Sequence, residues 1–302
     1  MPVAVLGAGV IGASWTSLFL AGGHDVTVFD PMDGAETKVK DYVGRARPTL
    51  ERLGLSGNGA LTFTNDPAGA VDGAIFIQES VPERIEIKHA LFERIESALA
   101  DDAIVMSSAS GLMLSEMQAG FTDPSTLILA HPFNPPHLIP LVELMENEKT
   151  APGLVARAEK FFHALGKVTI RVNREVPGHV ANRLQAALWR EAIHLVKEGV
   201  ASVEDVDKAV WSGPGLRWAA MGPTMLFNLG AGEGGMEEFC RRFGPSFDRW
   251  WDDMGKPRLD EATASMLTKG VNEEAAGAGL DDLSAKRDAL IEAMLQATKP
   301  LR

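Results

Sequence analysis

Short apolar runs alternate with amphipathic stretches through the first half of the chain. The runs are rich in β-branched residues and lie at 3–7, 25–30, 61–64, 73–79, 103–108 and 127–131. Amphipathic segments such as 83–100 separate them. Apolar strands that alternate with helices are typical of a parallel sheet covered on both faces. Residues 167–172 have the same character and predict one further strand.

The pattern changes after residues 173–179, where Pro177 and Gly178 interrupt the chain. Residues 180–202 predict one long amphipathic helix, and Ser202 followed by acidic residues predicts the start of the next helix. No further strand is expected. The sequence thus predicts an α/β fold. A Rossmann-like, mostly parallel sheet domain over 1–174 is followed by an all-helical C-terminal domain over 175–302.

Composition narrows the class of protein. The chain has 302 residues, 45% of them apolar and 23% charged, which is ordinary for a globular enzyme. Its net charge of −12 repels phosphate backbones, so we expect no nucleic-acid partner. The uncharged segment 2–23 lacks a basic leader and is broken by glycines, so we expect neither a signal peptide nor a membrane contact.

The number of cysteines indicates the cellular compartment and the kinds of site that are excluded. Cys240 is the only cysteine, which excludes a disulfide within the chain and a cysteine metal cluster. This favours a cytoplasmic protein without a metal site. Cys240 lies in a helical pattern, and we expect it to be a small core residue rather than a reactive thiol.

A glycine motif follows the first predicted strand. Gly7, Gly9 and Gly12 form a G-x-G-x-x-G pattern before a predicted helix. The first glycine permits a tight turn, the second lets the backbone approach a pyrophosphate, and the third allows close packing of helix and strand. The phosphates are expected on the amides of the helix N-terminus, where Val10 and Ile11 lie. The alternative is a glycine-rich turn without a ligand.

Asp30 ends the second predicted strand, in the position typical of a ribose-binding carboxylate. A carboxylate accepts hydrogen bonds from the adenosine ribose diol and repels a 2′-phosphate. No arginine or lysine follows within residues 31–36. The sequence therefore predicts NAD rather than NADP as the cofactor.

The segment AHPFNPPHLIPLVE (130–143) combines two histidines with a carboxylate. A buried strand should deliver His131 to the edge of the sheet where ligands bind. The prolines end that strand, and a turn near His137 would bring His131 beside Glu143. A carboxylate on one imidazole nitrogen fixes the tautomer and makes the other nitrogen a better base for an alcohol proton. The alternative is a structural histidine in a proline-rich loop.

Four segments occur in the order seen in one superfamily. They are the glycine motif, SSASGL (107–112), the segment at 130–143 and PGHVANRL (177–184). Over most of its length the chain resembles the 3-hydroxyacyl-CoA dehydrogenase superfamily. FIQESVPE (76–83) and GPGLRWAAMGP (213–223) are most similar to the branch that contains L-gulonate 3-dehydrogenase (lambda-crystallin) and L-carnitine 3-dehydrogenase.

The resemblance implies catalytic roles residue by residue. His131 matches the general base and Glu143 its partner. Ser110 and Asn182 match the residues that hydrogen-bond the substrate oxygen. The alternatives are a strand-end cap for Ser110 and a polar residue at a helix start for Asn182.

The resemblance also implies cofactor contacts. Glu83 and Lys88 fall where the family contacts the nicotinamide side of the cofactor, and their alternative is a solvated surface pair. Asn134, in the turn after His131, should help to hold the same site together with Ser110. A homodimer formed through the helical domain is a further implication, because the superfamily usually pairs subunits in that way.

One departure concerns the substrate. The family's CoA-dependent members often carry a lysine-rich insertion after the second strand, whereas residues 33–59 are short and have few basic side chains. Arg217 offers a planar cation for a free carboxylate, or alternatively an ion pair at a domain or subunit contact.

We therefore expect an NAD-dependent dehydrogenase that oxidises a small 3-hydroxy acid, similar to L-gulonate or L-carnitine, to the 3-oxo acid. Two alternatives remain open. One is a 3-hydroxyacyl-CoA dehydrogenase, and the other is an NAD-binding protein without catalysis, similar to a crystallin. The tryptophans of the second half, which could offer aromatic faces to a quaternary ammonium group, do not decide between these substrates.

Overall fold

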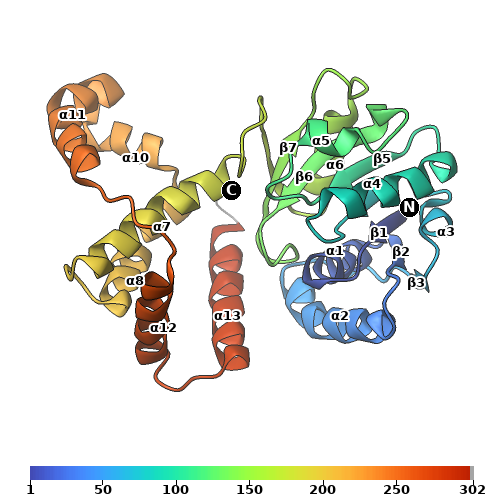
Figure 1. The fold of residues 1–302 in the computed structure, drawn as a ribbon, viewed down its shortest axis with the longest axis horizontal. Helices are drawn as coiled ribbons and strands as arrows, with labels where there is room; N and C mark the ends of the chain where they lie inside the picture. Colours follow the sequence, from blue (N-terminus) through green and yellow to red (C-terminus); the bar gives the residue numbers. More distant parts are fainter. Residues whose placement is uncertain (300–302) are drawn as a thin grey trace. The chain divides into compact units, whose positions relative to one another are not determined.

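The computed structural model describes residues 1–299 and places a single sheet in the first part of that range (Figure 1). Across the sheet the strand order is β3-β2-β1-β4-β5-β6-β7-β8. β7 runs antiparallel to β6, and the other neighbouring pairs are parallel. This confirms the predicted Rossmann-like, mostly parallel sheet. The strands are β1 Pro2–Leu6, β2 Asp25–Phe29, β3 Leu61–Thr64, β4 Phe76–Glu79, β5 Ile104–Ser107, β6 Leu127–Pro132, β7 Leu141–Met145 and β8 Val168–Arg171.

Helices cover both faces of the sheet, and alternate residues of each strand enter different cores. In β1, Val3 and Val5 belong to the core on the side of α1, α2 and α6, while Ala4 and Leu6 belong to the core on the side of α3, α4 and α5. Burial on both faces explains why the strands are continuous apolar runs. These helices are α1 Val10–Ala21, α2 Ala35–Arg52, α3 Pro67–Val71, α4 Ile85–Ile95, α5 Leu114–Gln118 and α6 Leu154–Ala164.

From residue 173 to residue 299 the chain contains helices and no strand, as the sequence predicts. Ser202 caps α8 by accepting a hydrogen bond from the amide of Asp205. The predicted helix over 180–202 is shorter than expected, because Gly199 adopts a left-handed φ of 69° just after its end. The helices are α7 Ala181–Lys197, α8 Val203–Ser212, α9 Pro214–Ala220, α10 Pro223–Gly230, α11 Gly235–Asp253, α12 Glu261–Ala275 and α13 Leu280–Thr298.

The chain divides into two compact units. The first comprises Met1–Arg183 and the C-terminal segment that begins at Lys286, and the second comprises Leu184–Ala285. Within the first unit, Glu292 of α13 accepts hydrogen bonds from Arg52 of α2 at 2.5 and 2.8 Å. Residues 175–183 and 286–299 of the predicted helical domain thus lie in the first unit. The assignment of that range as a substrate and dimerisation domain stays a prediction.

The second unit buries little apolar surface of its own. Cys240 is exposed on α11, so the expectation of a core cysteine is wrong. The aromatic side chains of α10 and α11, including Phe227, Phe239 and Phe247, pack against one another. Among residues 1–299, no helix combines the length and the apolar character that crossing a membrane requires.

Candidate active site

The glycine motif forms the turn between β1 and α1. Gly7 has a φ of 98°, and a Cβ there would lie 2.7 Å from the carbonyl oxygen of Ser80. A Cβ on Gly12 would lie 1.8 Å from the carbonyl oxygen of Gly7, whereas a Cβ on Gly9 would meet nothing within 4 Å. The protein itself therefore requires glycine at 7 and 12, while Gly9 borders open space. That arrangement fits the predicted approach of a pyrophosphate to the backbone.

The start of α1 and the end of β2 lie at this turn. The amides of Val10 and Ile11 are in the first helical turn and have no acceptor within the helix. Asp30 accepts hydrogen bonds from the amides of Ala8 at 2.8 Å and Met32 at 2.9 Å. The Asp30 carboxylate is thus fixed beside the glycine turn, where the predicted ribose contact would be made.

His131 and Glu143 lie side by side at the end of the sheet. They are register partners in the antiparallel pair β6 and β7, and His131 Nδ1 lies 2.7 Å from Glu143 Oε2. Both side chains are buried. Because a carboxylate only accepts, Nδ1 carries a proton, and in the neutral ring Nε2 is the nitrogen with the lone pair. The structure therefore brings together the two residues that the sequence predicted as a base and its partner.

The second oxygen of Glu143 binds the start of α7. Oε1 accepts hydrogen bonds from the amides of Val180 at 3.0 Å and Ala181 at 2.9 Å. Burial raises the pKa of Glu143, but the hydrogen bonds from His131 and from these two amides hold it below its ordinary value. Asn182 follows immediately on the first turn of α7. Glu143 therefore fixes the base and the helix that carries Asn182 to one another.

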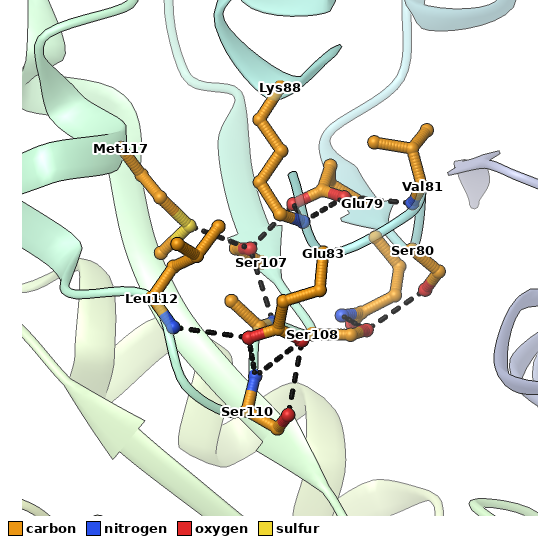
Figure 2. A network of polar contacts seen from close by, with 12 residues as sticks. Glu79, Ser80, Val81, Glu83, Lys88, Ser107, Ser108, Ser110, Leu112 and Met117 are labelled. Atoms are coloured by element: carbon orange, nitrogen blue, oxygen red, sulfur yellow. Dashed lines mark hydrogen bonds and ion pairs between the residues drawn. The ribbon is translucent and has the colours of Figure 1, made fainter. Parts of the chain in front are cut away.

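Ser110 is held by Glu83 (Figure 2). The Glu83 carboxylate accepts hydrogen bonds from the amide and hydroxyl of Ser110 and from the amides of Gly111 and Leu112, at 2.5 to 3.1 Å. Burial raises the pKa of Glu83, but these donors bring it below its ordinary value. The Ser110 hydroxyl donates to Glu83 in this arrangement. It must turn to donate to a substrate oxygen.

Two family models match the chain. The model described as "3-hydroxyacyl-CoA dehydrogenase, NAD binding domain" matches residues 2–176, and that described as "3-hydroxyacyl-CoA dehydrogenase, C-terminal domain" matches residues 178–280. The chain belongs to the 3-hydroxyacyl-CoA dehydrogenase family. It is accordingly an NAD-dependent oxidoreductase with a Rossmann-fold cofactor domain, as the sequence predicted.

Relatives and solved structures cover nearly the whole chain. L-carnitine dehydrogenase of Streptomyces coelicolor is 45% identical over 299 residues, which cover 98% of this chain and 94% of that protein. L-carnitine dehydrogenase of Burkholderia mallei is 41% identical over 97% of this chain and 92% of that protein. The crystal structure of an NAD⁺-dependent 5-formyl-3-hydroxy-2-methylpyridine 4-carboxylic acid 5-dehydrogenase has a TM-score of 0.84 and 29% identity, covering 99% of this chain and 98% of that chain.

One histidine near the candidate base of this 3-hydroxyacyl-CoA dehydrogenase family member was not identified from the sequence. His179 is buried, and its ring centroid lies 5.3 Å from that of His131. Its Nε2 donates to the carbonyl oxygen of Ala109 at 3.4 Å, next to Ser110. Burial, followed by the proximity of His131, lowers the pKa of His179. Its place in PGHVANRL, three residues before Asn182, was the signal that could have found it.

Hydrogen bonds from distant segments fix the turn between β6 and β7, and the sequence did not reveal these contacts either. The backbone amide of His137 and its Nδ1 both lie 2.8 Å from the hydroxyl oxygen of Ser14 on α1. Burial lowers the pKa of the His137 side chain to about 4. Lys167 donates to the carbonyl oxygens of Pro136 and Ile139, and burial lowers its pKa to about 7. The turn that aligns His131 with Glu143 is thus attached to the cofactor helix. Asn134 is exposed in this turn.

Lys88 and Arg217 are the two remaining predicted residues. Lys88 is buried and binds Glu79, so the alternative of a solvated surface pair with Glu83 is wrong. Arg217 is exposed on α9 of the second unit, and its contact with a substrate carboxylate stays a prediction. Among the residues that the structure describes, no group of three or more His, Cys, Asp or Glu side chains is arranged to hold a metal ion.

Proposed function

We propose that this chain oxidises L-carnitine to the corresponding 3-oxo acid with NAD. The observation that carries the proposal is the near-full-length similarity to L-carnitine dehydrogenases, combined with a His131–Glu143 pair of 2.7 Å at the ligand-binding edge of the sheet. A binding protein without catalysis does not require a buried base with a fixed tautomer. This supports an enzyme over the crystallin-like alternative.

In the proposed mechanism, NAD supplies the hydride acceptor when bound beside the glycine turn. His131 Nε2 removes the proton of the C3 hydroxyl while the hydride leaves C3, so that the C–O bond becomes a carbonyl. Glu143 stabilises the imidazolium that forms, and Ser110 and Asn182 hydrogen-bond the substrate oxygen. General-base catalysis of this kind contributes about 10²–10⁴-fold.

The two charged ends of L-carnitine define what else the site needs. We assign the carboxylate to Arg217, because a guanidinium binds a carboxylate through two parallel hydrogen bonds. The quaternary ammonium favours aromatic faces, and the second unit exposes several of them. These are Trp211, Trp218, Trp250 and Trp251. Few basic side chains occur at 33–59, which supports a free acid over a CoA thioester.

The exposed apolar surface of the second unit supports a homodimer. Large side chains such as Leu216, Leu229 and Trp251 are each about 60% exposed in the single chain. A second copy that covers this surface removes it from water. Sedimentation at micromolar concentration should give twice the mass of the chain, and a monomer mass would contradict this assignment. With one cysteine and no disulfide, the cytoplasm is the proposed compartment.

One absorbance assay at alkaline pH tests the proposed function. Purified protein is mixed with NAD and, in separate reactions, with L-carnitine, L-gulonate, 3-hydroxybutyrate or 3-hydroxybutyryl-CoA. We expect NADH formation with the highest kcat/KM for L-carnitine. The highest value for the CoA ester would replace the proposal by the CoA-dependent alternative, and no NADH with any substrate would support the non-catalytic one.

A further inference from the structure

A buried ion pair lies next to the loop that holds Ser110. Lys88 of α4 reaches Glu79 at the end of β4, with Nζ 2.6 and 2.7 Å from the two carboxylate oxygens (Figure 2). Lys88 is 1% exposed and Glu79 is fully buried. Removing two charges from water is unfavourable, and a buried pair often adds no stability over apolar residues of similar volume. Stability alone therefore does not account for this pair.

The carboxylate of Glu79 has no acceptor site left over. Oε1 accepts from Lys88 and from the amide of Val81 at 2.8 Å, and Oε2 accepts from Lys88 and from the hydroxyl of Ser107 at 2.5 Å. A carboxylate offers about four lone-pair sites, so all of them are used. The Ser107 hydroxyl in turn accepts from the amide of Ala109 at 3.3 Å.

These bonds reach the two loops at the carboxyl ends of β4 and β5. Val81 is two residues before Glu83, and Ala109 is one residue before Ser110. Glu83 then joins the same loops a second time, through Ser110, Gly111 and Leu112. The two loops are therefore connected twice, once through Glu79 with Ser107 and once through Glu83, as Figure 2 shows.

We propose that Glu79 and Lys88 are positioning residues, which align Ser110 and Glu83 for the reaction through Val81 and Ser107. Lys88 acts on this alignment through Glu79, because its ammonium is buried and bound to both Glu79 oxygens. This proposal rests on the roles proposed above for Ser110 and Glu83. Displacing a group of the reaction centre by about 1 Å can lower turnover by about 10²-fold.

The test is a set of substitutions that replace each charged side chain by an uncharged one of similar volume. Lys88→Met alone leaves a buried carboxylate unpaired, and Glu79→Gln alone leaves a buried ammonium unpaired, so both single variants should have a lowered Tm. The double variant Glu79→Gln, Lys88→Met keeps the volume and removes both charges, and its Tm should be close to that of the wild type. Its kcat at saturating NAD should nevertheless fall by about tenfold or more.

The matched control removes an exposed ion pair from the same segment. Arg84 and Glu86 pair at the start of α4, and both side chains are exposed. The variant Arg84→Met, Glu86→Gln should keep the wild-type kcat. A double variant at 79 and 88 with wild-type Tm and wild-type kcat would overturn the proposal, because the pair would then be structural only.

Hydrogen exchange tests the same alignment without any substrate. In the wild type the amides of Ser110, Gly111 and Leu112 should exchange slowly although this loop is partly exposed, and in the double variant about tenfold faster or more. Wild-type amides that exchange as fast as those of the loop at 56–59 would overturn the proposal, even if the double variant does not fold. If the wild type oxidises none of the four substrates, the proposed function fails while the exchange result still decides the alignment.

Discussion

The two units of the molecule treat polar and apolar side chains in opposite ways. The first unit buries charged and polar groups and pairs them, as in His131 with Glu143 and Lys88 with Glu79. The second unit exposes large apolar side chains, including Trp189, Trp250 and Leu280, and buries few residues, such as Ile193 and Val206.

This difference separates two parts of the function. Buried polar groups with complete hydrogen bonding hold a fixed geometry, which a proton and hydride transfer requires. Exposed apolar surface requires another partner, either a ligand or a second copy of the chain. We therefore propose that the reaction type depends on the first unit, and that substrate choice and assembly depend on the second. Substitutions of His131 and Glu143 in the first unit should lower kcat, while those of substrate-binding side chains in the second should change the KM for the substrate.

The largest expected effect in this comparison is that of Glu143→Gln. The amide oxygen of glutamine can still accept from Val180 and Ala181, but its NH₂ group would donate to His131 Nδ1. The proton of His131 would then sit on Nε2, which could no longer act as a base, so kcat should fall by about 10²–10⁴-fold. Steady-state kinetics check this. A kcat equal to that of the wild type would remove Glu143 from the mechanism.

Arg217→Met tests whether the second unit contributes to substrate binding. Loss of the guanidinium should raise the KM for L-carnitine by about tenfold or more, with a smaller change in kcat, because the carboxylate does not react. Arg249→Met, on the exposed surface of α11, is the matched control and should leave both constants unchanged. An effect on kcat alone would place Arg217 in the chemistry instead.

Asp30→Ala tests the cofactor side of the first unit. The KM for NAD should rise by about tenfold, corresponding to roughly 1.4 kcal/mol, while the KM for NADP rises less or falls. Asp30→Asn, which keeps an acceptor for the amide of Ala8 but not the charge, separates the turn contact from the ribose contact. If the ratio of the two KM values stays constant in both variants, Asp30 does not contact the ribose.

The smallest expected effect is on acid stability. The pKa of Glu143 in the folded chain lies below its ordinary value of 4.5. A lowered carboxylate pKa stabilises the fold above the unfolded value, and this contribution is lost as the pH falls through the folded value. The stability of the wild type relative to Glu143→Gln should therefore decrease below about pH 4.5, by roughly 1 kcal/mol per unit. A pH-independent difference in Tm would contradict the hydrogen bonds described here.

Much of the first unit was predictable, because its features depend on local pattern. Strands buried on both faces are apolar runs, and a strand–turn–strand segment with four prolines predicts that residues 131 and 143 approach one another. The glycine positions follow from backbone geometry alone. The Lys167 contacts and the place of His179 join segments that are distant in the sequence, and no local pattern encodes them. The pair of Glu79 with Lys88 joins a strand end to the next helix through a short loop, whose path the apolar pattern does not specify.

The second unit was predictable only as a series of helices. Cys240 fits an amphipathic pattern and was expected inside, yet the α11 surface on which it lies is exposed in the single chain. An apolar side chain at helical spacing faces whatever covers that helix, which can be its own unit or another molecule. The sequence does not distinguish these cases.

The most direct test of the account is His131→Ala, measured by kcat with NAD and L-carnitine and by the dissociation constant for NADH. The account predicts a kcat lowered by about 10²–10⁴-fold, because the only loss is the proton acceptor, and a nearly unchanged NADH dissociation constant. A variant that turns over like the wild type would contradict the mechanism. So would a variant that loses NADH binding together with turnover, since His131 would then be a structural residue.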